Sequence, residues 1–361
     1  MRPVHYLGVF IPIAVALEIA HAGPVLVFGA AALAVIPCAA VMGEATEAIA
    51  AKTGPGIGGL MNVTFGNAPE LIIAFFALIE GLQEVVKASI VGSIIGNILL
   101  VMGAAMLVGG LPRDKQTFSR TAANAQSAML MLALAALIFP AIFQLIHGGG
   151  LPAVGEERVN FGSEVEQLSF GVAIVLLLSY VAGLIFSLRT HRAVFNPYDE
   201  AGEDEEEHHW PVKRAAIYLA LSAVAVGLMS EILVGSISEA SDDIGLSEFF
   251  VGVFVVAIVG NAAEHWVAVL VAAKDKMDLA VNIAIGSSAQ IALFVAPLLV
   301  LLSFVVGPEP MALVFNGYEL GALLFSVLIA NLVTQEGESN WFEGVQLLAL
   351  YAVLGLVFYF A

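Results

Sequence analysis

Two short stretches of this chain carry the same polar pattern, Gly66-Asn67-Ala68-Pro69-Glu70 and Gly260-Asn261-Ala262-Ala263-Glu264. Each is followed, 26 residues after its first glycine, by a Gly-Ser pair, Gly92-Ser93 or Gly286-Ser287. A constant offset of 194 residues therefore relates the two sets. A carboxylate in an apolar membrane helix costs about 2.5–3.5 kcal/mol. A chain that places one at matched positions in both halves is predicted to have two repeats that share one ion site.

The surrounding sequence is typical of a membrane protein. Hydrophobic residues make up 60% of the chain and charged residues only 12%, whereas a soluble domain has about 25% charged residues. The single cysteine, Cys38, excludes an internal disulfide framework. Residues 1–21 are similar to a signal peptide, but Glu18 and His21 disturb the cleavage region, so we expect a retained first helix.

The apolar runs predict an all-α membrane protein with eleven transmembrane helices, because runs of about 20–30 residues are long enough to cross a hydrocarbon core of ~30 Å. Stretches rich in glycine, proline or charge mark the expected loops, as at 52–56, 111–115 and 307–310. The expected helices are 5–21, 24–53, 56–80, 84–109, 118–146, 165–190, 211–240, 246–273, 277–306, 311–333 and 341–360.

Basic residues orient these helices in the membrane. If the N-terminus is inside, 11 of the 13 Lys and Arg residues fall in cytoplasmic segments and only Lys87 and Arg158 fall outside. Lys and Arg favour the cytoplasmic side, so we expect a cytoplasmic N-terminus and an external C-terminus, in the cell membrane. Two repeats of five helices cross the membrane in opposite senses, because five is odd. The predicted parts are an extra N-terminal helix (1–21), a first repeat (24–190), an acidic cytoplasmic linker (191–210) and a second repeat (211–361).

The Gly-Asn-x-x-Glu stretches have a local interpretation and a functional one. Asn67 and Asn261 are suited to cap a helix, with Glu70 and Glu264 three residues later as in a capping box. A helix that starts in mid-membrane leaves unbonded carbonyls, which are tolerated only beside protein, water or an ion. Carboxylates and free carbonyls are the hard oxygen ligands that calcium takes. We therefore predict that Glu70 and Glu264 bind a metal cation.

Other polar residues lie near this pair. The two Gly-Ser stretches are suited to close helix packing in lipid, but each is followed by an amide, Asn97 or Gln290. His265 directly follows Glu264 and is either a hydrogen-bonded packing residue or a proton carrier. A zinc protease site is not supported, because the chain has no HExxH motif. The predicted polar shell of the ion comprises Asn67, Asn261, Ser93, Ser287, Asn97, Gln290 and His265.

Two further acidic features bear on access to the site. Glu44 and Glu231 follow similar Met-Gly and Met-Ser pairs, and inverted topology directs the first inward and the second outward. They are either water-facing end charges or they line the vestibules. The linker is a solvated segment or a collector of cations at the inner mouth. Its acidic residues are Asp199, Glu200, Glu203, Asp204, Glu205, Glu206 and Glu207.

Taken together, these motifs resemble the calcium/proton exchanger family of the cation/calcium exchanger superfamily over about residues 24–361. The resemblance implies a sodium/calcium-exchanger-like fold in which Glu70 and Glu264 bind calcium and exchange it for protons. Relatives that use sodium typically have Gly-Thr-Ser in place of Gly-Asn-Ala, so the match at Asn67, Asn261 and His265 favours protons. The resemblance also implies a regulatory or cation-collecting role for the acidic linker.

We therefore expect a secondary active antiporter, not an enzyme, that exports cytosolic Ca²⁺ in exchange for H⁺ by alternating access. An occluded site with two bare negative charges is strongly disfavoured, which couples movement to occupancy. Sodium/calcium exchange and a passive cation channel are the alternatives. We expect the lipid bilayer as partner, no nucleic acid, and no cofactor besides the transported Ca²⁺ and H⁺. The sequence leaves a homo-oligomer open.

Overall fold

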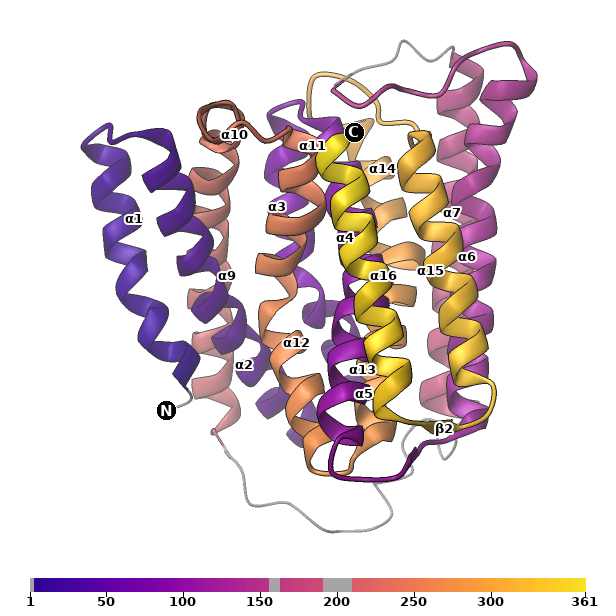
Figure 1. Ribbon diagram of the computed structural model, residues 1–361. Coiled ribbons are helices and arrows are strands. Elements are labelled where there is room, and N and C mark those ends of the chain that lie inside the picture. Colours follow the sequence, from indigo (N-terminus) through magenta and orange to yellow (C-terminus); the bar gives the residue numbers. More distant parts are fainter. Residues whose placement is uncertain (1–2, 156–162, 191–209) are drawn as a thin grey trace.

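The computed structural model describes residues 3–155, 163–190 and 210–361, which form a bundle of helices (Figure 1). A 3₁₀-helix, η1, spans Pro3–Val9. The α-helices are α1 (Phe10–Ile19), α2 (Pro24–Gly66), α3 (Ala68–Ile79), α4 (Gln83–Ile95), α5 (Met102–Gly110), α6 (Arg120–Ile146), α7 (Ser163–Ile185), α9 (Val212–Gly235), α10 (Ile237–Ile244), α11 (Glu248–Phe250), α12 (Ala257–Ala273), α13 (Met277–Gln290), α14 (Ala296–Ser303), α15 (Gly317–Thr334) and α16 (Trp341–Phe360). π-helical turns are η2 (Gly96–Val101), η3 (Phe186–Thr190), η5 (Val251–Val256) and η6 (Ile291–Val295).

Within the described residues, nine helices are long and apolar enough to cross a membrane, and two shorter apolar segments, Val4–Ile19 and Ala68–Ile79, accompany them. The helical membrane character is therefore confirmed, while the count of eleven spans and the proposed domain boundaries stay predictions. The chain starts at one end of the bundle and α16 finishes at the opposite end (Figure 1). An odd number of crossings requires that arrangement.

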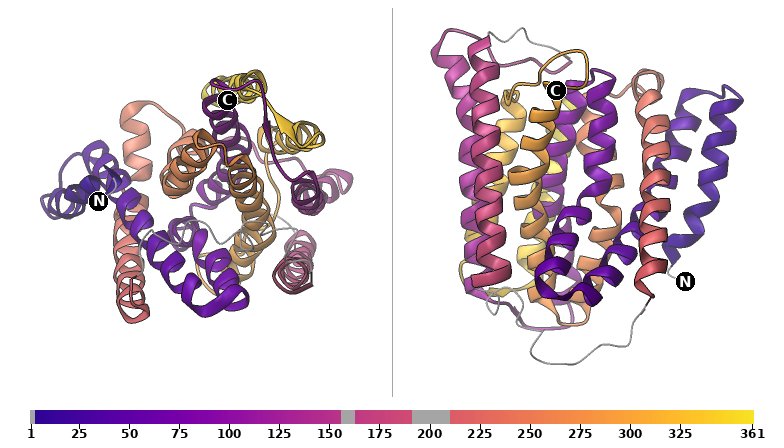
Figure 2. Two further views of the ribbon diagram at one scale, coloured as in Figure 1. Left: turned by 90° about the horizontal axis from the view of Figure 1, so that it is seen from below. Right: turned by 180° about the vertical axis from the view of Figure 1, so that it is seen from behind.

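The predicted loop at 52–56 is wrong, because α2 continues as one helix from Pro24 to Gly66. A straight helix of this length would be ~65 Å long, about twice the hydrocarbon core. Figure 2 shows α2 descending along one side and bending to continue across the lower end of the molecule. Glycine and proline are tolerated within membrane helices, because neighbouring helices, hydroxyl side chains or water can satisfy the backbone groups that they free.

Two other helices have boundaries that differ from the predicted ones, each for a local reason. The helix expected at 311–333 begins only at Gly317, because Asn316 caps it: Asn316 Oδ1 accepts from Glu319 N and Glu319 Oε2 accepts from Asn316 N. The helix expected at 211–240 divides at Ser236 into α9 and α10. A short antiparallel pair, β1 (Gln116–Thr117) with β2 (Glu338–Ser339), joins the loops that precede α6 and α16.

The centre of the bundle contains α4 and α13, which carry the two Gly-Ser pairs. Every residue of α4 is buried, and α13 packs against α4 and α5. The helix α4 continues into the π-helical turn η2, and α13 continues into η6. The two turns lie at nearly equivalent positions under the offset of 194 residues. The outer helices α6, α7 and α9 expose large apolar side chains, for example Phe139, Leu178 and Leu221. Large apolar side chains on the outside are expected where a helix faces lipid.

Candidate functional site

The two predicted glutamates lie on α3 and α12, which contact each other. Glu70 is buried in the first turn of α3, and Glu264 is half-buried in the middle of α12. A Cβ atom on Gly66 would lie 3.3 Å from Glu264 Oε1, and one on Gly260 would lie 3.2 Å from Glu70 Cγ. Each glycine therefore makes room for the glutamate of the other repeat, and the two carboxylates are close enough to interact electrostatically.

The capping-box interpretation of these motifs is wrong in both repeats. Asn67 does interrupt the helix between α2 and α3, with φ −97° and ψ 19°, but its side chain caps neither. Asn261 lies in the interior of α12, which runs through it without a break. The physical reason is that both amides bond elsewhere. Asn67 Nδ2 donates to Gln290 Oε1 at 2.6 Å, and Asn261 Nδ2 donates to Ser93 Oγ and to Ala257 O, both at 2.9 Å.

The remaining members of the predicted polar shell also pair with one another. Ser287 Oγ donates to Glu264 Oε2 at 2.7 Å, and His265 Nε2 lies 3.1 Å from Asn97 Oδ1. Asn97 belongs to η2, so the π-helical turn of one repeat brings an amide to the histidine of the other. Each of the seven residues of the predicted shell thus has a side-chain contact with another of them or with Glu264.

Several buried oxygens at this centre have no hydrogen-bond partner among the described residues. They are Asn67 Oδ1, Asn261 Oδ1 and Glu70 Oε2. A buried acceptor left unsatisfied costs about 1–3 kcal/mol. Amide and carboxylate oxygens are hard ligands, so a cation is one group that would satisfy them.

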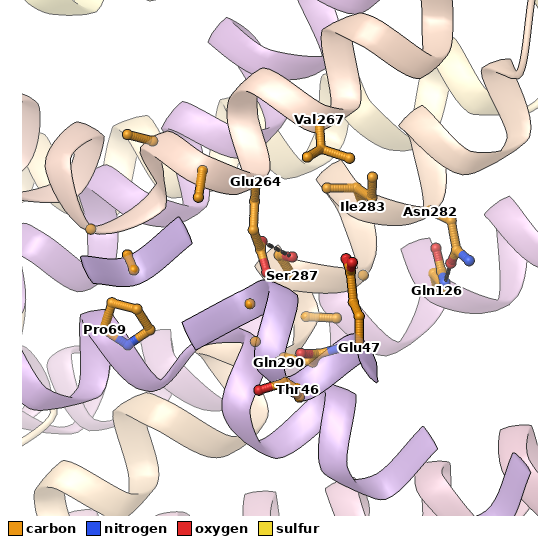
Figure 3. Close-up of a pocket in the computed structure, with 18 of the residues that line it drawn as sticks. Thr46, Glu47, Pro69, Gln126, Glu264, Val267, Asn282, Ile283, Ser287 and Gln290 are labelled. Carbon is orange, nitrogen blue, oxygen red and sulfur yellow. Dashed lines mark hydrogen bonds between the residues drawn. The ribbon is translucent and has the colours of Figure 1, made fainter. Parts of the chain in front are cut away.

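A cavity of about 410 Å³ leads to Glu264 and Ser287 (Figure 3). It is also lined by Val4 of η1 and by Ser187 and Leu188 of η3. The cavity therefore reaches the end of the bundle where the chain begins. Glu70 is not among the residues that line it and lies instead on a gap of about 10 Å³, which Ser93 also lines. The two matched glutamates consequently differ in access.

The predicted access residues lie in different surroundings. Glu44 lines the large cavity, and its Oε1 lies 3.4 Å from His5 Nε2 of the N-terminal 3₁₀-helix. Glu231 is exposed on α9 and lines neither of the two cavities described above. The acidic residues Asp199 to Glu207 lie outside the described residues.

Sequence reasoning gave no site role to three residues that line the cavity. Glu47 extends into it toward the same space as Glu264, with which it interacts electrostatically (Figure 3). Gln126 of α6 and Asn282 of α13 are hydrogen-bonded to each other on its wall. The available signals were the three-residue spacing of Glu47 from Glu44, which places both on one helix face, and amides within otherwise apolar helices.

Comparison with known proteins assigns this architecture to a family. The family described as sodium/calcium exchanger protein matches residues 23–189 and 214–360. A Ca²⁺/H⁺ antiporter of Synechocystis sp. is 45% identical, over 98% of this chain and 96% of the relative. The Ca²⁺/H⁺ antiporter ChaA of Bacillus subtilis is 43% identical, over 97% of this chain and 96% of the relative.

Solved structures agree with the fold. The structure of native YfkE superposes with a TM-score of 0.81 at 38% identity and covers 98% of both chains. The H⁺/Ca²⁺ exchanger CAX has a TM-score of 0.70 at 13% identity, over 99% of this chain and 91% of the other, and supports the fold alone. The expectation of a sodium/calcium-exchanger-like helical fold is therefore confirmed.

Proposed function

Because the chain belongs to the sodium/calcium exchanger protein family and is related over nearly its full length to Ca²⁺/H⁺ antiporters, we propose that it exchanges Ca²⁺ for H⁺ across a membrane. It is a transporter rather than an enzyme. The observation that carries the proposal most directly is the crossed packing of Gly66 on Glu264 and of Gly260 on Glu70. This packing supports one shared site made by both repeats.

Calcium is proposed to bind between Glu70 and Glu264. Among the described residues, no three His, Cys, Asp or Glu side chains gather to hold a metal ion. The site would therefore use two carboxylates, completed by neutral oxygens. The unpartnered amide oxygens of Asn67 and Asn261 are suited to this task. Calcium normally takes six to eight oxygens, so water or backbone carbonyls would supply the rest.

Exchange is proposed to proceed by alternating access. Calcium enters through the cavity and binds the deprotonated pair. On the opposite side protons displace it, and the protonated pair then returns and releases protons into the cavity. An empty, doubly charged pair in a closed site is strongly disfavoured, which prevents return without a bound ion. The difference between the cavity at Glu264 and the small gap at Glu70 supports a state open on one side only.

The cavity side is proposed to be cytoplasmic, in the cell membrane. The support is the distribution of Lys and Arg, 11 of 13 of which fall on that side of the proposed topology. Calcium would then move outward and protons inward. The acidic linker, which connects α7 to α9 along the chain, is proposed to concentrate cations on the cytoplasmic side.

Calcium uptake into vesicles containing the purified protein tests the proposal. An imposed pH gradient should drive uptake, and a sodium gradient at clamped pH and matched ionic strength should not. Comparable uptake with sodium alone would favour sodium/calcium exchange, and calcium flux without any counter-gradient would favour a channel. Glu70→Gln and Glu264→Gln should each abolish exchange, since the amide keeps the shape and loses the charge. Near wild-type flux in either folded variant would refute the paired-glutamate site.

A further inference from the structure

The two matched serines of the site bond to different kinds of partner. Ser287 Oγ donates to Glu264, the glutamate of its own repeat. Ser93, its counterpart at an offset of 194 residues, does not bond to Glu70 and instead accepts a hydrogen bond from Asn261 of the other repeat. Glu70 Oε2 is correspondingly left without a partner among the described residues. The hydrogen bonding is therefore asymmetric although the residues are the same.

The asymmetry accompanies a difference in the surroundings of the two glutamates. A Cβ atom on Gly66 would lie 3.3 Å from the carboxylate oxygen Oε1 of Glu264, whereas one on Gly260 would lie 3.2 Å from the Cγ of Glu70. Access to the two halves differs as well. Ser287 and Glu264 line the cavity of about 410 Å³, whereas Ser93 and Glu70 line the gap of about 10 Å³.

We propose that Ser93 and Ser287 are positioning residues that exchange partners during transport, an inference that rests on the proposed function. In the half that is open, the serine hydroxyl donates to the glutamate of its own repeat. In the half that is closed, the serine accepts from the asparagine of the other repeat. The state open to the opposite side then has Ser93 bonded to Glu70, and Asn67 bonded to Ser287.

A hydroxyl is suited to this exchange because it can both donate and accept, whereas a carboxylate only accepts and an amide nitrogen only donates. In the open half it orients the carboxylate that meets the incoming ion. In the closed half the bond between Asn261 and Ser93 joins α12 to α4. Each serine thus links the conformation of its half to the orientation of one glutamate.

The side-chain amides beside the serines differ between the two repeats in one respect. Asn67, which would pair with Ser287 in the other state, here donates to Gln290. The counterpart of Gln290 at an offset of 194 residues is Gly96, which has no side chain. Only Asn67 therefore has a second side-chain partner available, and the exchange we propose is carried by the serines.

The test uses the full chain in vesicles of known orientation, with the half-saturating calcium concentration measured separately from each side. Ser287→Ala should raise the half-saturating calcium concentration on the cavity side about tenfold more than on the opposite side, because a hydrogen bond to a charged group is lost there. Ser93→Ala should show the reverse preference. Ser287→Thr and Ser93→Thr, which keep a hydroxyl, should restore the wild-type ratio between sides. Ser288→Ala is the matched control, since Ser288 is buried beside Ser287 but bonds only backbone oxygens of Ala284 and Ile94.

Equal shifts on both sides in both alanine variants, or no shift, would overturn the partner exchange. Either outcome would leave the proposal of calcium/proton exchange intact, because that proposal is tested separately by the glutamate variants and the imposed gradients. A structure of the wild-type protein open to the opposite side gives a second measurement that requires no variant to fold. It should place Ser93 Oγ within hydrogen-bond distance of Glu70, and a retained bond between Ser287 and Glu264 in that closed half would refute the proposal.

Discussion

Replacing Gly92 by alanine should destabilise the protein far more than replacing its repeat counterpart, Gly286. A Cβ atom on Gly92 would lie 2.7 Å from the Cα and the carbonyl carbon of Val253, and closer still to its carbonyl oxygen. Carbon atoms in contact normally lie about 3.5–4.0 Å apart, so α4 and η5 would have to separate by roughly 1 Å. A Cβ atom on Gly286 would lie no closer than 3.5 Å to Gln126, which is an ordinary contact.

The size of the effect follows from what would have to move. Overpacking a core typically costs about 1–3 kcal/mol, and here the obstacle is helix backbone, which cannot rotate away as a side chain can. We therefore expect Gly92→Ala to cost about 3 kcal/mol, near the upper end, and to lower the unfolding temperature in mild detergent by several degrees. Gly286→Ala should stay close to wild type. Thermal unfolding followed by tryptophan fluorescence measures both, and equal losses in the two variants would refute the packing difference between the halves.

The remaining predictions concern the linker, the histidine and a buried charge cluster. Neutralising the seven acidic residues between Asp199 and Glu207 should change the apparent calcium affinity or the rate without removing exchange; total loss of transport in a well-folded variant would show that the linker belongs to the core machinery. The effect should shrink at high salt, because the Debye length falls from ~8 Å at physiological ionic strength to ~3 Å at 1 M. His265→Ala removes the contact with Asn97 Oδ1 and should shift the pH optimum of calcium uptake more than it weakens calcium binding; an unchanged pH profile would remove the histidine's role and leave the exchanger. Lys87 is buried near Glu84 and Glu319 and donates to Val314 O at 3.1 Å; Lys87→Met should lower thermal stability by about 3–5 kcal/mol through the unpaired charge it leaves. The double variant Lys87→Met/Glu319→Gln should recover part of that loss, and strictly additive losses would contradict the pairing.

The candidate site residues can be recognised in the sequence alone, because their chemical type is unusual in its surroundings. Carboxylates and amides are rare within apolar helices, since each is costly in lipid. Glu70, Glu264 and their shell therefore stand out without knowledge of the fold. Glu47 was harder to assign, because one carboxylate near a helix end is compatible with solvent exposure. Only the cavity that it lines together with Glu264 indicates otherwise.

The course of α2 was not accessible in the same way. Gly54, Pro55 and Gly56 are strong loop signals in a soluble protein, yet α2 passes through them. Local propensity is a weak guide that the structural context of a helix can override. The same competition explains Asn261, a suitable helix cap by sequence that lies inside α12 because its amide bonds to Ser93.

The sequence by itself determined that this is a helical membrane protein, that its halves are related by 194 residues and that two glutamates occupy matched positions. These properties depend on hydrophobicity and spacing along the chain. Only the tertiary structure decided that Gly66 packs on Glu264 and Gly260 on Glu70, and that Ser287 bonds to a glutamate while Ser93 bonds to an asparagine. The sequence motif alone does not distinguish one repeat from the other. The two repeats become different only in the folded chain, where Glu264 and Ser287 line the large cavity whereas Glu70 and Ser93 line the small gap.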